Sequence, residues 1–370
     1  MKKIKNVGII AFATLGIVAG LASCGSKTYE IALITDIGDI DDKSFNQGAW
    51  EGVKAYAEEN DISHQYYKPA KQTTTDYVDS IDLAVNNGAK VVVTPGYLFE
   101  EPIFIVQDKY PEVHFILLDG EPHNGDYTVY ETKDNVQPIL YAEEQSGYLA
   151  GYAAVKDGFR NLGFMGGMAV PAVKRFGLGY LVGIDDAAKE LALTEQIPVK
   201  YHYTGGFAAT PEAQTKATTW YQAGVGVVFA CGGSVGQSVM AAAENEESMV
   251  IGVDVNQGYD NENVITSAMK GLASSVVQAL EAHYDGTWVG GETWNLDASK
   301  NGVGLPTETE TWRFETFTIE DYNAIFADLA GGTVTVVDRL PATYLGDADP
   351  ATAVAALDTT LTSITVSFEA

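Results

Sequence analysis

The chain has few of the residues that build metal sites and disulfides. Its 370 residues include two cysteines and five histidines. No Cys/His cluster and no His-x-x-x-His spacing occurs, so a zinc site is not expected. Cys24 lies near the N-terminus, and Cys231 ends an apolar run in which burial as a small hydrophobic residue is expected. These shortages argue against a zinc enzyme and against a disulfide-rich scaffold.

Positive charge is also scarce. The chain holds 22 Lys and Arg against 50 Asp and Glu, a formal net charge of −28. A surface of this sign repels the phosphates of nucleic acid and the head groups of anionic lipid. Neither is therefore expected as a partner.

The N-terminus has the pattern of an export signal. Lys2, Lys3 and Lys5 precede an uncharged apolar run over 7–22, which is shorter than the roughly 20 residues of a membrane-spanning helix and is typical of a signal peptide. The run ends in Leu-Ala-Ser-Cys-Gly, which resembles a bacterial lipobox. We predict a signal peptide over 1–23, a lipidated Cys24, and a tether over 24–29 on the extracytoplasmic face of the cell membrane. The alternative is a plain signal peptide with an incidental cysteine.

Short strand-like runs alternate with amphipathic helical stretches along most of the chain. This alternation predicts parallel sheets built from βα units, and the length predicts two α/β lobes. The expected strands are 31–34, 64–67, 90–94, 113–118, 127–130, 162–165, 199–203, 225–230, 249–253, 264–267, 333–337 and 363–368. The expected helices are 44–57, 76–86, 102–109, 139–155, 173–191, 211–223, 235–243, 270–284 and 319–329.

The loop over 35–47 follows the first expected strand and runs into the first expected helix. In such folds ligands bind at the carboxyl ends of strands. The loop lacks the Gly-x-Gly-x-x-Gly spacing of a dinucleotide site and the Gly-Lys-Ser/Thr of a phosphate loop, and its acids would repel phosphate. It therefore indicates a polar, uncharged ligand with an aromatic face. The alternative is an acidic surface turn, and Asp41, Asp42 and Lys43 are interpreted as helix-capping and ion-pair groups.

Further candidate ligand groups follow other expected strands. Two aromatic rings can sandwich a flat heterocycle, and each stacking contact contributes about 1–3 kcal/mol. The carboxylate and amide of the first loop suit the polar edge of that heterocycle, and an aspartate with a lysine suits vicinal hydroxyls. No nucleophile lies beside a general base, so the pattern indicates binding, with no enzymatic activity and no cofactor. The candidates are Asp36, Phe45, Asn46, Phe207, Asp254 and Lys270.

Six segments carry a resemblance to one family. In their order and spacing, the chain is similar to the basic membrane lipoprotein family, the purine nucleoside receptor A-like substrate-binding lipoproteins of bacterial ABC transporters. The resemblance implies a type I periplasmic-binding-protein fold, two doubly wound parallel-sheet lobes around a central ligand cleft. The six segments are 35–47, 143–152, 166–171, 227–233, 251–257 and 265–270.

The resemblance also implies roles for single residues. Phe45 and Phe207 would stack on a purine while Asp36 and Asn46 read its edge. Asp254 and Lys270 would hold the ribose, and Gly232 and Gly233 would allow close backbone approach to the sugar. We predict lobe 1 from 30–136 with 263–290, and lobe 2 from 137–262 with 291–370.

The expected function is the capture of purine nucleosides (adenosine, guanosine or inosine) by a monomer that delivers them to an ABC permease in the membrane. One alternative is a sugar or autoinducer receptor on the same fold, whose sites use more arginine. Arg160, Arg175, Arg313 and Arg339 are placed outside the strand-end loops. A nucleoside hydrolase is a second alternative, because the acidic loop is similar to a calcium site. A surface adhesin or antigen without a transport role is a third.

Overall fold

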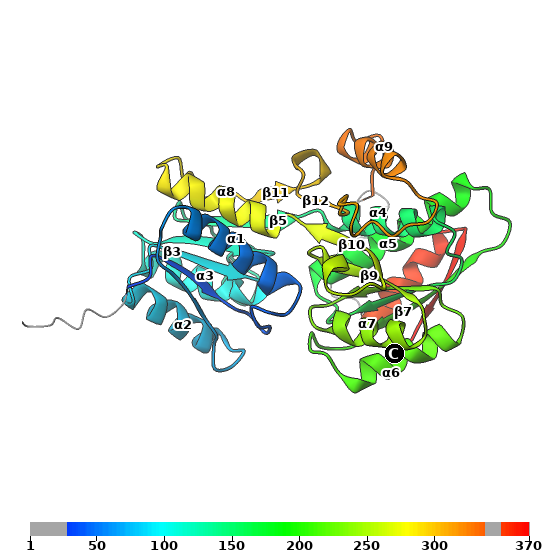
Figure 1. Ribbon diagram of the computed structural model, residues 1–370. Coiled ribbons are helices and arrows are strands. Elements are labelled where there is room, and N and C mark those ends of the chain that lie inside the picture. Colours follow the sequence, from blue (N-terminus) through cyan, green and yellow to red (C-terminus); the bar gives the residue numbers. More distant parts are fainter. Residues whose placement is uncertain (1–27, 337–348, 370) are drawn as a thin grey trace, which may run out of the picture.

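Two α/β lobes lie side by side in the computed structural model, which describes residues 28–336 and 349–369 (Figure 1). The expected two-lobed α/β architecture with parallel sheets is confirmed. The predicted signal peptide over 1–23, Cys24, and residues 25–27 of the predicted tether lie outside the described residues.

The first lobe is a six-stranded parallel sheet in the order β11-β5-β4-β3-β1-β2. Its inner strands β1, β3 and β4 are mainly apolar on both faces because helices cover both faces. Ile31 and Leu33 belong to the core beneath α1 and α8, whereas Ala32 and Ile34 pack in the core beneath α2 and α3. The strands are β1 (Ile31–Ile34), β2 (His64–Tyr67), β3 (Val91–Pro95), β4 (His114–Leu118), β5 (Val136–Tyr141) and β11 (Trp294–Leu296). The helices are α1 (Phe45–Glu59), α2 (Thr74–Asn86), α3 (Glu100–Lys109), α8 (Leu272–Tyr284) and the 3₁₀ helix η1 (Tyr97–Phe99).

The second lobe is a seven-stranded sheet in the order β12-β10-β9-β8-β6-β7-β13. Only the β10–β12 pair is antiparallel among the strand pairs of the described chain. The strands are β6 (Leu162–Gly166), β7 (Ile197–Tyr203), β8 (Val227–Cys231), β9 (Met249–Asp254), β10 (Val264–Lys270), β12 (Val303–Gly304) and β13 (Ile364–Phe368). The helices are α4 (Glu143–Lys156), α5 (Pro171–Glu190), α6 (Pro211–Gln222), α7 (Val235–Asn245), α9 (Ile319–Ala330) and α11 (Pro350–Ala355). The 3₁₀ helices are η2 (Gln257–Tyr259), η3 (Ala298–Lys300) and η5 (Ala356–Thr359).

Helices α4 and α5 pack so closely that their backbones touch. A Cβ atom on Gly179 would lie 1.9 Å from the carbonyl oxygen of Glu144, and one on Gly147 would lie 2.1 Å from that of Phe176. Only glycine fits at such positions, as in other close helix pairs. The contact holds the first turns of both helices together at the carboxyl edge of the sheet.

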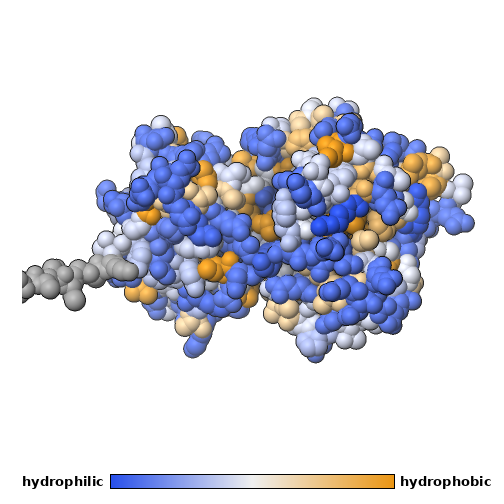
Figure 2. Space-filling view, in the orientation of Figure 1, coloured by the Kyte–Doolittle hydropathy of each residue, from blue (hydrophilic) through white to orange (hydrophobic). Residues whose placement is uncertain are grey.

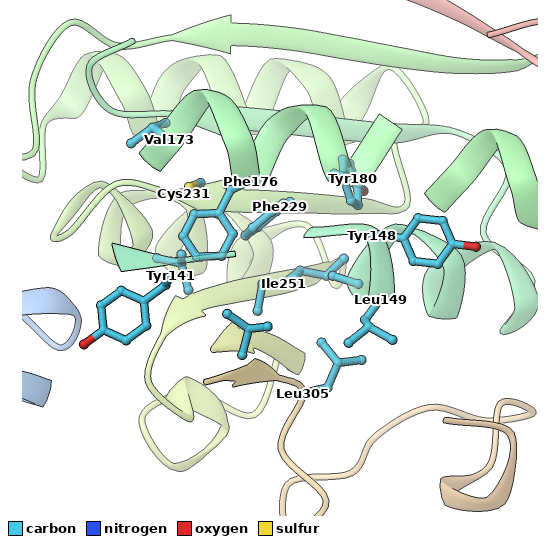
Figure 3. Packing of buried hydrophobic residues seen from close by; sticks show 14 of the residues in the cluster. Tyr141, Tyr148, Leu149, Val173, Phe176, Tyr180, Phe229, Cys231, Ile251 and Leu305 are labelled. Carbon is cyan, nitrogen blue, oxygen red and sulfur yellow. The ribbon is translucent and has the colours of Figure 1, made fainter. Parts of the chain in front are cut away.

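Aromatic side chains fill the core behind these turns (Figure 3). The Phe229 ring of β8 meets the rings of Tyr180 and Phe176 edge-on, with centroids 5.3 and 5.9 Å apart. Edge-to-face pairs of this kind add about 0.5–1.5 kcal/mol beyond area burial. Cys231 is buried in the same cluster, as predicted. This packing fixes the backbone from which the adjoining polar side chains project.

The sheet memberships correct the predicted lobe boundaries. Strand β10 (264–270) pairs with β9 in the second sheet, although 263–290 was predicted for lobe 1. Strands β5 and β11 pair in the first sheet, although 137–141 and 294–296 were predicted for lobe 2. The reason is that the chain changes lobes after β5, β10 and β11, so each of these strands belongs to the lobe that it is about to leave.

Four predicted elements differ from the structure. Residues 139–141 end strand β5, where the start of the helix 139–155 was expected, and Lys270 ends β10 instead of starting a helix. The segment 127–130 is no strand, because only an isolated bridge joins Tyr130 to His123. Residues 333–336 are not extended either, and 337 lies outside the described residues.

The surface in view is mainly hydrophilic, with apolar residues scattered over both lobes (Figure 2). Within 28–336 and 349–369, no helix has the length and apolar character needed to cross a membrane.

Candidate functional site

A cavity of about 840 Å³ lies between the lobes. Its walls are the carboxyl ends of strands from both sheets, where ligands bind in folds of this class. All eight residues predicted from the sequence line this cavity. They are Asp36, Phe45, Asn46, Phe207, Gly232, Gly233, Asp254 and Lys270.

The first wall is the loop between β1 and α1, which Asp42 organises. Its carboxylate accepts from the backbone N–H groups of Ser44 (2.9 Å), Asn46 (3.1 Å) and Gln47 (3.1 Å). These are N–H groups that the start of α1 would otherwise leave without partners. The predicted capping role of Asp42 is confirmed.

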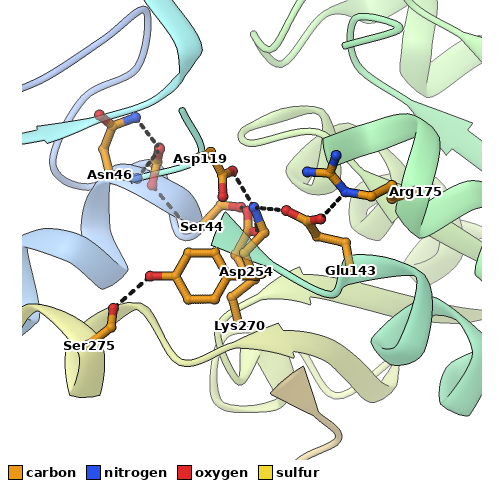
Figure 4. A network of polar contacts seen from close by, with 10 residues as sticks. Ser44, Asn46, Asp119, Glu143, Arg175, Asp254, Lys270 and Ser275 are labelled. Atoms are coloured by element: carbon orange, nitrogen blue, oxygen red, sulfur yellow. Dashed lines mark hydrogen bonds and ion pairs between the residues drawn. The ribbon is translucent and has the colours of Figure 1, made fainter. Parts of the chain in front are cut away.

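Lys270 lies at the centre of a buried network between the lobes (Figure 4). Its ammonium pairs with Asp119 at the end of β4, with Glu143 Oε1 at 3.1 Å, and with Asp254 Oδ1 at 4.0 Å. Its side chain is 2 % exposed. The Ser44 hydroxyl donates to Asp254 Oδ2 at 2.5 Å, which links the first lobe to the second.

Glu143 continues this network to Arg175. Its buried carboxylate accepts from Arg175 Nε at 2.5 Å. Glu143 begins α4 and Arg175 lies in the second turn of α5, and the close packing at Gly147 and Gly179 holds these two helices together. Arg175 lines the cavity, so its predicted place away from the site is wrong.

Burial and charge set the protonation of this network. Burial alone would lower the pKa of Lys270, but Asp119, Glu143 and Asp254 raise it above its ordinary value, so the ammonium stays charged. Burial raises the pKa of Asp119 to about 7 against the opposing effect of Lys270. The pKa of Glu143 falls because Arg175 and Lys270 outweigh its burial. The centre is thus a fixed cation among carboxylates of unequal acidity.

The two predicted stacking residues belong to opposite lobes. Phe45 begins α1, and its ring lies 4.8 Å from the Lys270 ammonium. Phe207 follows β7, and its ring packs against glycines. A Cβ on Gly167 would lie 2.5 Å from the Phe207 ring. Gly233 has a φ of +53°, and a Cβ on Gly232 would meet the backbone of Gly167 at 2.6 Å. Contacts and backbone conformation within the protein are therefore enough to explain these glycines, without a contact to a ligand.

Replacing Gly167 with alanine should disturb the site through Phe207. The new methyl group overlaps the ring, so the ring must move, and we expect ligand affinity to fall by about 1–3 kcal/mol, the value of one aromatic stacking contact. Gly206→Ala is the matched control, because a Cβ there meets no atom within 4 Å. Isothermal titration of both variants checks this. Equal affinities in the two variants would show that the position of the Phe207 ring does not matter.

The sequence reasoning missed part of the cavity wall. Asp119 lines it, and its Oδ1 is buried with no hydrogen-bond partner within the described chain. Asp119 follows β4 and Asp254 ends β9. Both have a positive φ (+57° and +67°), a conformation that is uncommon outside glycine and concentrates at functional sites. The place of Asp119 after an apolar run, the same signal as at Asp36, could have identified it. The other missed residues of the cavity wall include Arg175, Phe176, Tyr97, Glu100, Glu121, Tyr127 and Tyr130. Glu143, which pairs with Lys270, was missed as well. Over the described ranges, no group of three or more His, Cys, Asp and Glu side chains is placed to hold a metal ion.

Asp36 should make stability depend on pH. Burial raises its pKa from 3.8 to about 6. Between about pH 4 and pH 6 the native state keeps a proton that the unfolded chain has lost, so the free energy of unfolding falls as pH rises through this window. Asp36→Asn should remove this fall, a change of about 1–3 kcal/mol. Urea denaturation of the unliganded protein at pH 4–7 measures it, with Asp39→Asn, at an exposed position, as the control. An unchanged slope in Asp36→Asn would contradict the prediction.

The chain is similar to proteins of one transport family. A family model described as "ABC transporter substrate-binding protein PnrA-like" matches residues 29–322. The "ABC transporter nucleoside-binding protein BmpA" of Lactococcus lactis is 28% identical over 341 residues, covering 84% of this chain and 93% of that protein. "Basic membrane protein B" of Borreliella burgdorferi is 27% identical over 293 residues, 77% of this chain and 83% of that protein. An "uncharacterized lipoprotein" of Pyrococcus abyssi is 28% identical over 318 residues, 80% of this chain and 75% of that protein.

Solved structures agree on the fold. An ABC transporter solute-binding protein from Aeropyrum pernix superposes with a TM-score of 0.68 at 23% identity, covering 91% of this chain and 87% of the other. One from Conexibacter woesei gives 0.67 at 24% identity, covering 83% and 98%. The two-lobed, type I periplasmic-binding-like fold predicted from the sequence is confirmed. Because the family model matches most of its length, the chain belongs to the family of PnrA-like ABC transporter substrate-binding proteins.

Proposed function

We propose that this protein captures purine nucleosides in the cavity between its lobes and delivers them to an ABC permease. The observation that carries the proposal is the pair Phe45 and Phe207, which come from opposite lobes and line one cavity. Two such rings suit the two faces of a base, with about 1–3 kcal/mol for each stacking contact. The name of the Lactococcus lactis relative, a nucleoside-binding protein, supports the same ligand class.

The charged network, which lies beside Phe45 in the cavity, suits a ribose. Lys270 supplies N–H donors, and Asp254 and Asp119 supply carboxylate acceptors. The unpartnered Oδ1 of Asp119 is free to accept from a hydroxyl. Vicinal hydroxyls both donate and accept, so a mixed set of donors and acceptors suits them better than either alone.

Contacts between the lobes support a closing motion around the ligand. The Gln257 amide donates to the carbonyl oxygen of Lys43 at 2.7 Å, and the Lys43 ammonium lies 3.0 Å from Asp260. Together with the Ser44–Asp254 bond, these contacts join the two rims of the cavity. Hinge closure is the usual motion of such two-lobed binding proteins, and a closed form presents a distinct surface to a permease.

Isothermal titration tests the ligand class. The purified protein is titrated with adenosine, guanosine, inosine, cytidine and ribose. Saturable heat with at least one purine nucleoside, and much weaker binding of cytidine and ribose, is expected. Heat with ribose and none with any purine nucleoside would overturn the proposal.

A sugar receptor is the second candidate, because Arg175 does line the cavity beside an acid. The nucleoside is preferred because a flat base has two π faces on which Phe45 and Phe207 could stack, and because the name of the Lactococcus lactis relative supports this ligand class. Titration with ribose distinguishes the two candidates, because a sugar receptor should bind ribose and a nucleoside receptor should bind it only weakly.

We also propose that lipid on Cys24 anchors the protein to the outer face of the membrane, as the lipobox-like sequence suggests. Cys24→Ala should move the protein from the membrane fraction to the soluble fraction, because a signal peptide alone leaves no anchor. Cys231→Ala is the control, since that cysteine is buried. Immunoblots of fractionated cells report the outcome. Retention of Cys24→Ala in membranes after a high-salt wash would refute lipidation at this residue.

A further inference from the structure

The hydrogen bonds of Asn46 leave it with no donor for a ligand. Its two N–H groups donate to Asp36 Oδ1 at 2.8 Å and to Asp42 Oδ2 at 2.9 Å. Its Oδ1 accepts from the backbone N–H of Asp36 at 3.2 Å. Because two carboxylates face its nitrogen and an N–H faces its oxygen, a flipped amide would lose all three bonds. Asn46 can therefore offer a ligand only the second lone pair of its oxygen.

Asp36 likewise offers only an acceptor. Its Oδ1 is occupied by the Asn46 amide and by the backbone N–H of Gly38 at 2.9 Å. Its Oδ2 accepts none of the hydrogen bonds found in the described part of the chain. A Cβ on Gly96 would lie 3.0 Å from this oxygen, so the glycine leaves Oδ2 uncovered. This wall of the cavity thus presents acceptors, and one of them is a carboxylate.

Tyr97 does not change this balance. Its hydroxyl is close enough to Asp36 for the negative charge to raise its pKa further, after burial. A neutral phenol can either donate or accept. The Tyr97 hydroxyl can therefore form a hydrogen bond with any of the bases, and it does not discriminate among them.

We infer that the site prefers purine nucleosides whose base carries donors on its Watson–Crick edge, guanosine first and inosine second, over adenosine. Guanine presents N1–H and a 2-amino group, and hypoxanthine presents N1–H. Adenine presents its 6-amino group beside an N1 lone pair, which would face a carboxylate. The inference rests on the proposed function and on Asp36 facing the base edge.

The wild-type protein gives the first test, by isothermal titration with guanosine, inosine, adenosine and purine riboside, which lacks an N1–H. Guanosine should bind roughly 5- to 150-fold more tightly than adenosine, the size of one good pairing contact, and inosine should bind more tightly than purine riboside. Equal affinities for all four would overturn the inference and leave the proposed function intact. Binding of none would overturn the proposed function itself.

Asp36→Asn gives the second test. Asparagine keeps an acceptor toward Asn46 and Gly38 and places an N–H₂ group where Oδ2 faces the ligand. The binding of guanosine should weaken and the binding of adenosine should not. The ratio of the guanosine affinity to the adenosine affinity should therefore fall to about one or below. Asp39→Asn is the control for the loss of one acid from the same loop, because Asp39 is 57 % exposed and paired with Lys68. A guanosine-to-adenosine ratio that is unchanged in Asp36→Asn would also overturn the inference.

Discussion

Replacing Lys270 with methionine should cost more than any other single change in the site. We expect the free energy of unfolding to fall by about 3–5 kcal/mol at pH 7, because removing one partner of a buried ion pair leaves uncompensated charge. Asp119, Glu143 and Asp254 would lose their common cation. Nucleoside binding should be lost as well, since the donors proposed for the ribose are gone. Urea denaturation and titration calorimetry measure the two effects.

The pH dependence of this variant identifies the cause. Protons can replace the missing cation on the carboxylates, and Asp119 already has a pKa of about 7. The destabilisation should therefore shrink from pH 7 to pH 5. Lys43→Met is the matched control, because this lysine also pairs with an aspartate across the lobes but is 44 % exposed, and exposed pairs contribute about 0–1 kcal/mol. Equal destabilisation of the two variants at both pH values would contradict the role assigned to the network.

Removing either aromatic ring should weaken nucleoside binding by about 1–3 kcal/mol, the value of one base–aromatic contact. Phe45→Ala and Phe207→Ala should both weaken binding, because the two rings come from opposite lobes and line one cavity. The double variant should lose nearly the sum, since each ring would contact a different face of the base. Isothermal titration with guanosine gives the affinities.

Melting temperatures of the unliganded variants separate binding from packing. Both phenylalanines are half-buried and also touch the core. Phe326→Ala removes a half-buried ring on α9 that does not line the cavity, so it should lower the melting temperature without changing affinity. A Phe45→Ala variant that melts far below the wild type yet binds normally would show that Phe45 is a core residue and nothing more.

The alternation of strands and helices was predictable because most inner strands are apolar on both faces and most helices have one apolar stripe. Strand β5 was missed for local reasons. Pro138 argues against an interior strand, and Ala142 is the only residue between β5 and α4. The apolar residues of the two elements therefore merge into one helical pattern. The segment 127–130 was wrongly predicted as a strand, because its residue types favour strands. Its side chains at Tyr127, Val129 and Tyr130 are 48–62 % exposed, and the segment pairs with neither sheet of the described chain.

The site was predictable where a polar residue follows an apolar strand, as at Asp36 and Asp254. Glu143 was not, because an acid in the first turn of a helix has an ordinary explanation in the helix dipole. Its pairing with Arg175 depends on how helices α4 and α5 pack. The glycines allow this packing, but the sequence alone does not show which helix they would contact. The hydrogen-bond state of Asn46 likewise depends on which three groups surround one amide.

A structure of the protein crystallised with guanosine tests the proposed mode of binding most directly. We expect the base between Phe45 and Phe207, its Watson–Crick edge at Asp36, and the ribose hydroxyls at Lys270 and Asp254. Guanosine bound elsewhere, or in the cavity with its base away from both rings, would contradict this mode of binding.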